Sequence, residues 1–146
     1  MPPAPINIAI IGVGNCASSL VQGLSFYRPE SNDHHGLMHW DLGGYRPCDI
    51  KVAAAWDIDR RKVGKDVAEA VLAKPNCTQI FCADIKPSGT TVEMGRILDG
   101  VAEHMEDYPD ERTFLPANAP QATRESVVRR LREAKVDVLL NYLPVG

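Results

Sequence analysis

Two glycines near the amino terminus have the type and spacing of a phosphate-binding turn. Gly12 and Gly14 follow an apolar, β-branched run at residues 6–11 and precede a stretch with helical character. A strand, a glycine-rich turn and a helix start, in that order, are typical of a dinucleotide site, because the free amides and dipole of the helix start attract phosphate charge. Gly12 allows the tight turn, Gly14 leaves room for a pyrophosphate, and the small Ala17 replaces the third glycine. A tight strand-to-helix turn without a ligand is the alternative.

Asp57 is the second residue with a chemical interpretation. It closes an apolar run at residues 50–56, and in dinucleotide folds an acid at this strand end binds the adenosine ribose hydroxyls. Asp57 lies more than twice the usual spacing of about 20 residues after Gly12, and an irregular insert accounts for the excess. Its charge favours NAD over NADP, whereas Arg60 and Arg61 are the counter-argument because arginine binds a 2′-phosphate. A role for Asp57 as a helix N-cap is compatible with ribose binding.

Alternating strand and helix signals indicate how the chain positions these residues. We expect strands at residues 6–11, 50–56, 78–83 and 136–141, and helices at 15–27, 60–73, 94–105 and 123–134. This order predicts an α/β fold with a Rossmann-like, doubly wound parallel sheet. The sheet is incomplete, with about the first four strands of that fold.

The ends of the later strands provide further candidate residues. Ligands of open α/β sheets bind at the carboxyl ends of the strands, next to the first strand. The segment after the fourth strand, with Asn141, Tyr142, Leu143 and Pro144, is therefore expected to meet the ribose and nicotinamide. The loop at residues 84–89 is expected to pass near the adenine, with Ile85 as its apolar contact. Surface packing explains Ile85 equally well.

Two segments, residues 29–49 and 107–121, have the composition of long loops. The first is long for a strand–helix–strand connection, which indicates either a function or packing against something else. It contains His34, His35 and His39, for which metal binding is conceivable. Gly36 and the polar surroundings argue against a helix that would align them, so we expect solvated histidines and no metal site.

Composition excludes several classes of protein. The chain has 146 residues, 45% hydrophobic and 24% charged, with a net charge of −3, which suits one soluble domain. The acidic balance argues against nucleic-acid and anionic-membrane partners, and no apolar run is long enough to span a bilayer. The four cysteines form no CxxC pair. A reducing, cytoplasmic setting is the simpler interpretation.

The glycine-rich segment also supports a family resemblance. Residues 12–23 resemble the NAD loop of inositol-3-phosphate synthase, in its bacterial and archaeal branch. Other segments resemble the same family in the same order along nearly the whole chain: residues 36–39, 52–54, 57–59, 62–64, Asp66, 133–139 and 142–146.

This resemblance implies an isomerase of inositol and phospholipid biosynthesis. Members convert glucose 6-phosphate to 1D-myo-inositol 3-phosphate: NAD oxidises C5, an enolate forms and closes onto C1 in an aldol step, and the NADH reduces the product. The resemblance places Gly12, Gly14, Asn15 and Cys16 at the pyrophosphate and Asp57 at the ribose. It also places Asp66 and Ala134 near the cofactor, although core packing explains Ala134 as well.

Members of this family are more than twice as long as this chain, and their substrate pocket, catalytic lysines and tetramer-forming sheet follow the segment at Gly146. We therefore expect residues 1–146 to be the amino-terminal NAD-binding portion, without catalytic residues and inactive alone. Glucose 6-phosphate binding and a homotetramer are expected only of the full-length enzyme. The alternatives are the NAD-binding half of another dehydrogenase, a non-catalytic nucleotide-binding module, or an inert fragment with an exposed sheet edge.

Overall fold

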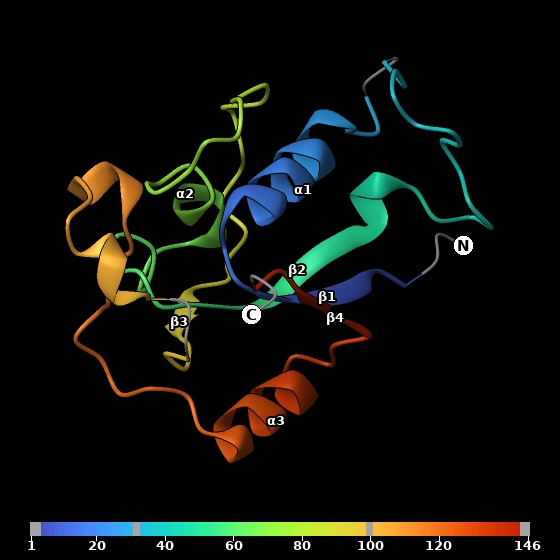
Figure 1. Cartoon of the computed structure of the whole chain (residues 1–146). Helices are drawn as coiled ribbons and strands as arrows, with labels where there is room; N and C mark the ends of the chain where they lie inside the picture. Colours follow the sequence, from blue (N-terminus) through green and yellow to red (C-terminus); the bar gives the residue numbers. More distant parts are fainter. Residues whose placement is uncertain (1–3, 31–32, 99–100, 144–146) are drawn as a thin grey trace.

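A four-stranded parallel sheet forms the centre of the computed structural model, which describes residues 4–30, 33–98 and 101–143 (Figure 1). The strand order is β3-β2-β1-β4. The bounds are Ile6–Ile11 for β1, Ile50–Asp57 for β2, Val92–Met94 for β3 and Val138–Asn141 for β4. The first strand therefore lies between the second and the fourth, as expected, and the Rossmann-like fold class is confirmed.

Helices cover both faces of the sheet. Figure 1 shows α1 (Asn15–Phe26) and α2 (Val67–Ala70) on one side and α3 (Arg124–Glu133) on the other. Side chains alternate along a strand. Ile8 and Ile10 accordingly pack in the core cluster on the side of α1 and α2, whereas Ala9 packs in a second cluster with residues of α3. Apolar side chains on both faces explain why β1 is a nearly continuous apolar run.

Local signals place the ends of two helices. Thr123 caps α3, because its hydroxyl accepts the Ser126 amide at 3.1 Å while the Ser126 hydroxyl accepts the Thr123 amide at 2.9 Å. The predicted first helix is confirmed to within a residue, with Tyr27 as its C-cap. None of the helices in the described ranges has the length and apolar character needed to cross a membrane.

The prediction of a third strand at residues 78–83 is wrong. The amides of Phe81 and Cys82 donate to the side-chain oxygen of Gln22 at 2.8 and 3.1 Å. This run is therefore held against α1 and does not join the sheet. The third strand is β3, which ends at Met94, the first residue of the helix predicted at 94–105. Its neighbour Gly95 donates its amide to the Asp57 carbonyl at 2.8 Å, which keeps the chain extended beside β2.

The helices predicted at 60–73 and 94–105 are also largely wrong. Gly64 adopts φ +85°, and its amide donates to the Val92 carbonyl at 2.8 Å, so the chain turns there and α2 begins only after Asp66. Among the described residues of the second segment, the helical part is one 3₁₀ turn, Glu103–Met105. The helical spacing of apolar residues did not distinguish these turns from true helices, because hydrogen bonds to distant segments determine the backbone conformation here.

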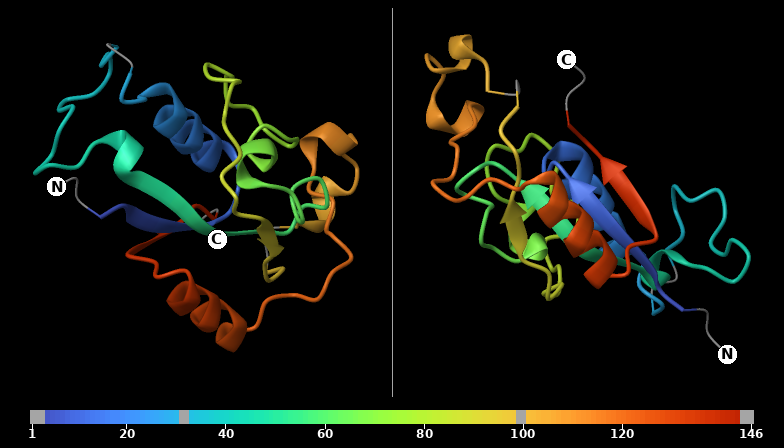
Figure 2. Two further views of the ribbon diagram at one scale, coloured as in Figure 1. Left: turned by 180° about the vertical axis from the view of Figure 1, so that it is seen from behind. Right: turned by 90° about the horizontal axis from the view of Figure 1, so that it is seen from below.

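In their described residues, both predicted long loops are irregular apart from short 3₁₀ turns, Pro47–Asp49 and Asp110–Arg112, and isolated β-bridges at Leu42–Tyr45 and Pro116. Figure 2 shows the insert after α1 and the segment before α3 on opposite sides of the molecule. In the insert, the His34 ring stacks on Trp40 with 3.9 Å between ring centroids. No group of three or more potential metal ligands occurs among the residues that the structure describes.

Candidate functional site

The turn between β1 and α1 requires Gly12 for the fold itself. Gly12 has φ +92°, a conformation that residues with a Cβ rarely adopt. A Cβ at this position would lie 3.2 Å from the carbonyl carbon of Tyr142, because β4 ends directly beside the turn. The Gly12 amide donates to the Trp56 carbonyl at 2.9 Å. Gly12 therefore directly follows β1 and contacts the ends of β2 and β4.

Gly14 is not required by the packing of the chain. Within the described part of the chain, no atom outside its own neighbours comes within 4 Å of a Cβ built on Gly14. Its φ of −101° lies outside the left-handed region that favours glycine. Open space above a backbone at a helix start is the space that a diphosphate needs.

The start of α1 leaves its amides available. Gly14 is the N-cap, the first turn contains no acidic side chain, and no side chain caps it in the described structure. The first helical hydrogen bond is donated by Ser18 to the Gly14 carbonyl at 2.9 Å. The preceding amides, including those of Asn15 and Cys16, consequently have no partner within the helix. An anion would satisfy them and would interact favourably with the helix dipole.

Asp57 faces this turn. Its Oδ2 accepts the Val13 amide at 2.7 Å, and its Oδ1 accepts the amides of Ile58 and Asp59 at 2.8 and 2.9 Å. The carboxylate is thus fixed between β2 and the glycine-rich turn. Because an ionised carboxylate accepts about four hydrogen bonds, Asp57 retains capacity for a ribose hydroxyl.

Lys62 is part of the site, although the sequence analysis gave it no role beyond its place in the predicted helix at 60–73 and in the family-like segment 62–64. Its side chain is 1% exposed, and Nζ donates to the carbonyls of Val13 and Pro75. Burial lowers the pKa of Lys62, while the negative charges of Asp57 and Asp59 oppose that shift. The resemblance includes residues 62–64, but it does not show that this lysine is buried, because the Val13 and Pro75 carbonyls that it contacts come from separate segments.

Asp59 and Arg61 form an ion pair next to the site, in which Asp59 is buried and Arg61 is partly buried. Arg61 Nη2 lies 2.6 Å from Asp59 Oδ2 and Nε lies 2.8 Å from Oδ1, while Asp59 has no exposed surface. Burial by itself raises the pKa of Asp59, but hydrogen bonds from Arg61 and from the Leu115 amide outweigh it and hold that pKa below 3.8. Arg61 also donates to the carbonyls of Asp110 and Thr113. Its guanidinium is therefore committed to the protein.

A segment after α2 lies beside the glycine-rich turn. Asn15 Oδ1 accepts the Cys77 amide at 2.9 Å, and the Asn15 carbonyl accepts the Thr78 hydroxyl at 3.0 Å. Cys16 and Cys77 are exposed. The sequence did not indicate that residues 75–78 border this turn, because the contact joins positions about 60 residues apart in the chain.

The end of β4 meets the turn as expected. Asn141 pairs with Ile11, and the Tyr142 amide donates to the Ile11 carbonyl at 2.8 Å. Asn141 Oδ1 accepts the Leu143 amide at 3.0 Å, so these residues continue past the strand end beside Gly12. Pro144 lies outside the described residues.

Three other candidates lie away from the glycine-rich turn or have structural partners. Asp66 caps α2 through the Ala68 amide and accepts hydrogen bonds from Ser88 and Gly89. Ile85 packs on the core and lines a surface pocket with residues from the beginnings of β1 and β2. Ala134 ends α3 and packs against the sheet. The geometry therefore brings together the turn, Asp57 and the end of β4, without these three.

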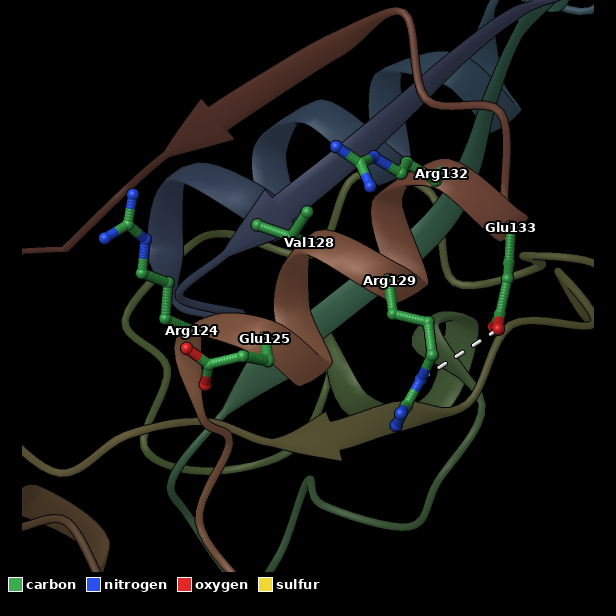
Figure 3. Close-up of a pocket in the computed structure, with 6 residues that line it drawn as sticks. All are labelled: Arg124, Glu125, Val128, Arg129, Arg132 and Glu133. Atoms are coloured by element: carbon green, nitrogen blue, oxygen red, sulfur yellow. Dashed lines mark ion pairs between the residues drawn. The ribbon is translucent and has the colours of Figure 1, made fainter.

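Another surface pocket lies on α3 alone. Figure 3 shows its lining residues, Arg124, Glu125, Val128, Arg129, Arg132 and Glu133, on the surface of one helix. Arg129 and Glu133 form an ion pair at 4.0 Å. The pocket includes no residue of the glycine-rich turn, so it is not part of the candidate site.

Comparisons with known proteins agree with this geometry. No family model matches the chain. Inositol-3-phosphate synthase of Corynebacterium glutamicum is 45% identical over 148 residues, covering 100% of this chain and 38% of that protein. The enzyme of the same name from Mycolicibacterium smegmatis is 44% identical over 143 residues, covering 97% of this chain and 37% of that protein. The chain is homologous to the amino-terminal part of the inositol-3-phosphate synthases. It spans less than two-fifths of the length of these curated relatives.

Solved structures share the fold of this chain. The crystal structure of Ari2 has a TM-score of 0.72 at 32% identity, covering 97% of this chain and 38% of that one. A myo-inositol-1-phosphate synthase-related protein from Thermotoga maritima has a TM-score of 0.67 at 22% identity, covering 95% and 34%, and supports the fold alone. The inositol-3-phosphate synthase relationship and the Rossmann-like sheet together indicate a nucleotide cofactor.

Proposed function

We propose that this chain is the NAD-binding part of an inositol-3-phosphate synthase. The observation that carries the proposal is the hydrogen bond between the Asp57 carboxylate and the Val13 amide. It brings a ribose-binding acid to the same turn whose open Gly14 and uncapped helix start suit a diphosphate. A nucleotide cofactor therefore fits the residues present.

Each part of the site has a proposed role. The amides at the start of α1, from Gly14 to Cys16, hold the pyrophosphate, and Asp57 accepts hydrogen bonds from the adenosine ribose hydroxyls. Asn141, Tyr142 and Leu143 flank the turn from β4 and orient the ribose and nicotinamide. When bound, NAD supplies a hydride acceptor, and the protein supplies its orientation.

The preference for NAD over NADP is part of the proposal. A 2′-phosphate on the adenosine ribose would meet the Asp57 carboxylate, which repels it. Arg61, which the sequence offered as a phosphate ligand, already donates to Asp59, Asp110 and Thr113. It cannot turn to a phosphate without breaking its ion pair with the buried Asp59.

The activity of the whole enzyme is proposed for the longer protein. There, glucose 6-phosphate would be isomerised to 1D-myo-inositol 3-phosphate by oxidation, enolisation, aldol closure and re-reduction, within a homotetramer. We propose that the present chain binds NAD but does not turn over glucose 6-phosphate alone. All four cysteines lie in the described ranges and are free, which supports a proposed cytoplasmic setting.

Calorimetric titration of the purified chain tests the proposal. We expect NAD+ to bind at least tenfold more tightly than NADP+, and Asp57→Asn to weaken NAD+ binding at least tenfold. Asp84→Asn is the matched control, because Asp84 is largely exposed and pairs with Arg28 outside the site. Absence of NAD+ binding to the wild-type chain, or equal binding by Asp57→Asn, would refute the proposed function.

A further inference from the structure

The buried ammonium of Lys62 is paired in an unusual way. It donates to two backbone carbonyls, those of Val13 and Pro75. None of the ion pairs found in the described ranges includes Lys62, although Asp57 and Asp59 are close enough to act on its charge. A buried charge on neutral carbonyls is costly, and an apolar side chain of similar length would avoid that cost. Core stability alone therefore gives a weak reason for a lysine at this position.

The contact with Val13 gives a better reason. Val13 lies between Gly12 and Gly14, and both of its backbone polar groups are held by charged side chains. Its amide donates to Asp57 Oδ2 at 2.7 Å, and its carbonyl accepts from Lys62 Nζ. The peptide unit before Val13 is thus fixed by the Asp57 carboxylate, and the peptide unit after it by the Lys62 ammonium. The Val13 side chain is fully buried.

This arrangement controls which backbone groups are presented to an anion. A carbonyl oxygen directed at a diphosphate would repel it, and the Val13 carbonyl is the one immediately before the N-cap of α1. Lys62 holds that carbonyl toward the protein interior. The amides that follow, at the uncapped start of the helix, remain for the ligand. The positive charge beneath the turn also favours a dianionic group above it.

We propose that Lys62 is a positioning residue for the diphosphate of the dinucleotide, acting through the Val13 carbonyl. The inference rests on the proposed function, because it assumes that a diphosphate binds at this turn. It assigns to Lys62 a role in ligand affinity that neither the glycine pattern nor Asp57 provides.

The test compares ligands with and without a diphosphate. Lys62→Met removes the donor and the charge at similar length, and Lys62→Gln restores a donor without the charge. Lys65→Met is the control, because Lys65 is half-exposed and pairs with Glu69 at 2.7 Å. NAD+, ADP and adenosine are titrated into each variant by NMR chemical shifts, which report weak binding. Urea unfolding shows whether each variant is folded.

We expect Lys62→Met to weaken NAD+ and ADP at least tenfold and adenosine less than threefold. Lys62→Gln should lie between Lys62→Met and the wild type, and Lys65→Met should match the wild type. If Lys62→Met does not fold, the same comparison of the three ligands is made with Lys62→Gln alone, for which a selective loss of diphosphate ligands is expected.

Two results would overturn the inference. Equal weakening of all three ligands would mean that Lys62 only supports the fold, and unchanged binding of NAD+ and ADP would mean that it does not act on the diphosphate. In both cases the proposed function stands, because the wild type binds NAD+. If the wild type binds neither NAD+ nor ADP, the proposed function itself is wrong and this inference is lost with it.

Discussion

Alanine is predicted to lower the stability of the fold at Gly12, and to lower the affinity for NAD+ at Gly14. At Gly12, φ +92° puts a side chain in a region that costs about 1–3 kcal/mol. The added Cβ would also lie 3.2 Å from the Tyr142 carbonyl carbon, and such overpacking costs about 1–3 kcal/mol more. We expect Gly12→Ala to lose about 2–6 kcal/mol of unfolding free energy, which for a chain of this size lowers Tm by about 5–20 °C.

Gly14→Ala is expected to leave stability almost unchanged. Its φ of −101° lies outside the left-handed region, and in the described structure the added methyl meets nothing within 4 Å. A smaller entropy loss on folding stabilises the variant by about 0.4–1 kcal/mol, and the poorer N-cap propensity of alanine offsets this by about 0.5–1 kcal/mol. The methyl would instead occupy the space of the diphosphate. We expect NAD+ affinity to fall at least tenfold, which is about 1.4 kcal/mol.

Urea unfolding and NAD+ titration of both variants separate these effects. Gly23→Ala, in the interior of α1, is the control, and it is expected to add up to about 1 kcal/mol of stability without changing affinity. The reasoning is refuted if Gly14→Ala binds NAD+ as the wild type does, since the open space would then have no ligand. It is also refuted if Gly12→Ala unfolds at the wild-type urea concentration.

Three further predictions concern stability and association. Gln22→Leu removes the acceptor of the Phe81 and Cys82 amides, so urea unfolding should show a loss of about 2–5 kcal/mol, and a loss below 0.5 would contradict this role. The pKa of Asp59 is lower in the folded protein than its ordinary value of 3.8, so the folded state binds fewer protons than the unfolded state. The resulting stabilisation is complete above the unfolded pKa and is lost as the pH falls through the folded pKa. Asp59→Asn should therefore be less stable at pH 7 and show a flatter loss of stability below pH ~4, and an unchanged acid limb in urea titrations would exclude this origin. Among the described strands β4 pairs with β1 alone, and its Leu139 is half-exposed, so the free edge of β4 is open to another chain. Light scattering should therefore show concentration-dependent association, which Leu139→Lys should reduce. Equal scattering by both proteins would argue against an edge contact.

Local patterns were sufficient for the parts of the fold that are contiguous in sequence. The run at residues 6–11, the turn at Gly12 and the first helix were predicted with nearly the observed bounds. The same holds for β2 with Asp57 at its end and for the cap at Thr123. In each case the signal lies within a few residues, where periodicity and capping chemistry act.

The middle of the chain could not be predicted in this way. Residues 78–83 have the composition of a strand, but the Gln22 side chain satisfies their amides from a helix about 60 residues earlier. Val92–Met94 is a strand because it pairs with β2 and because Val92 also forms hydrogen bonds with Gly64 and Lys65 in the turn before α2. Such competition between hydrogen-bond partners is decided by tertiary packing and not by propensity.

For the candidate site, the sequence by itself determined that a glycine-rich turn, a helix start and an acidic strand end belong together. These features depend on residue type and strand order, which a linear pattern contains. Only the tertiary structure decided that Lys62 lies beneath the turn and that Arg61 is committed to Asp59. The physical reason is that the burial of these groups, and the carbonyls of Val13, Asp110 and Thr113 to which they donate, come from segments distant in the chain.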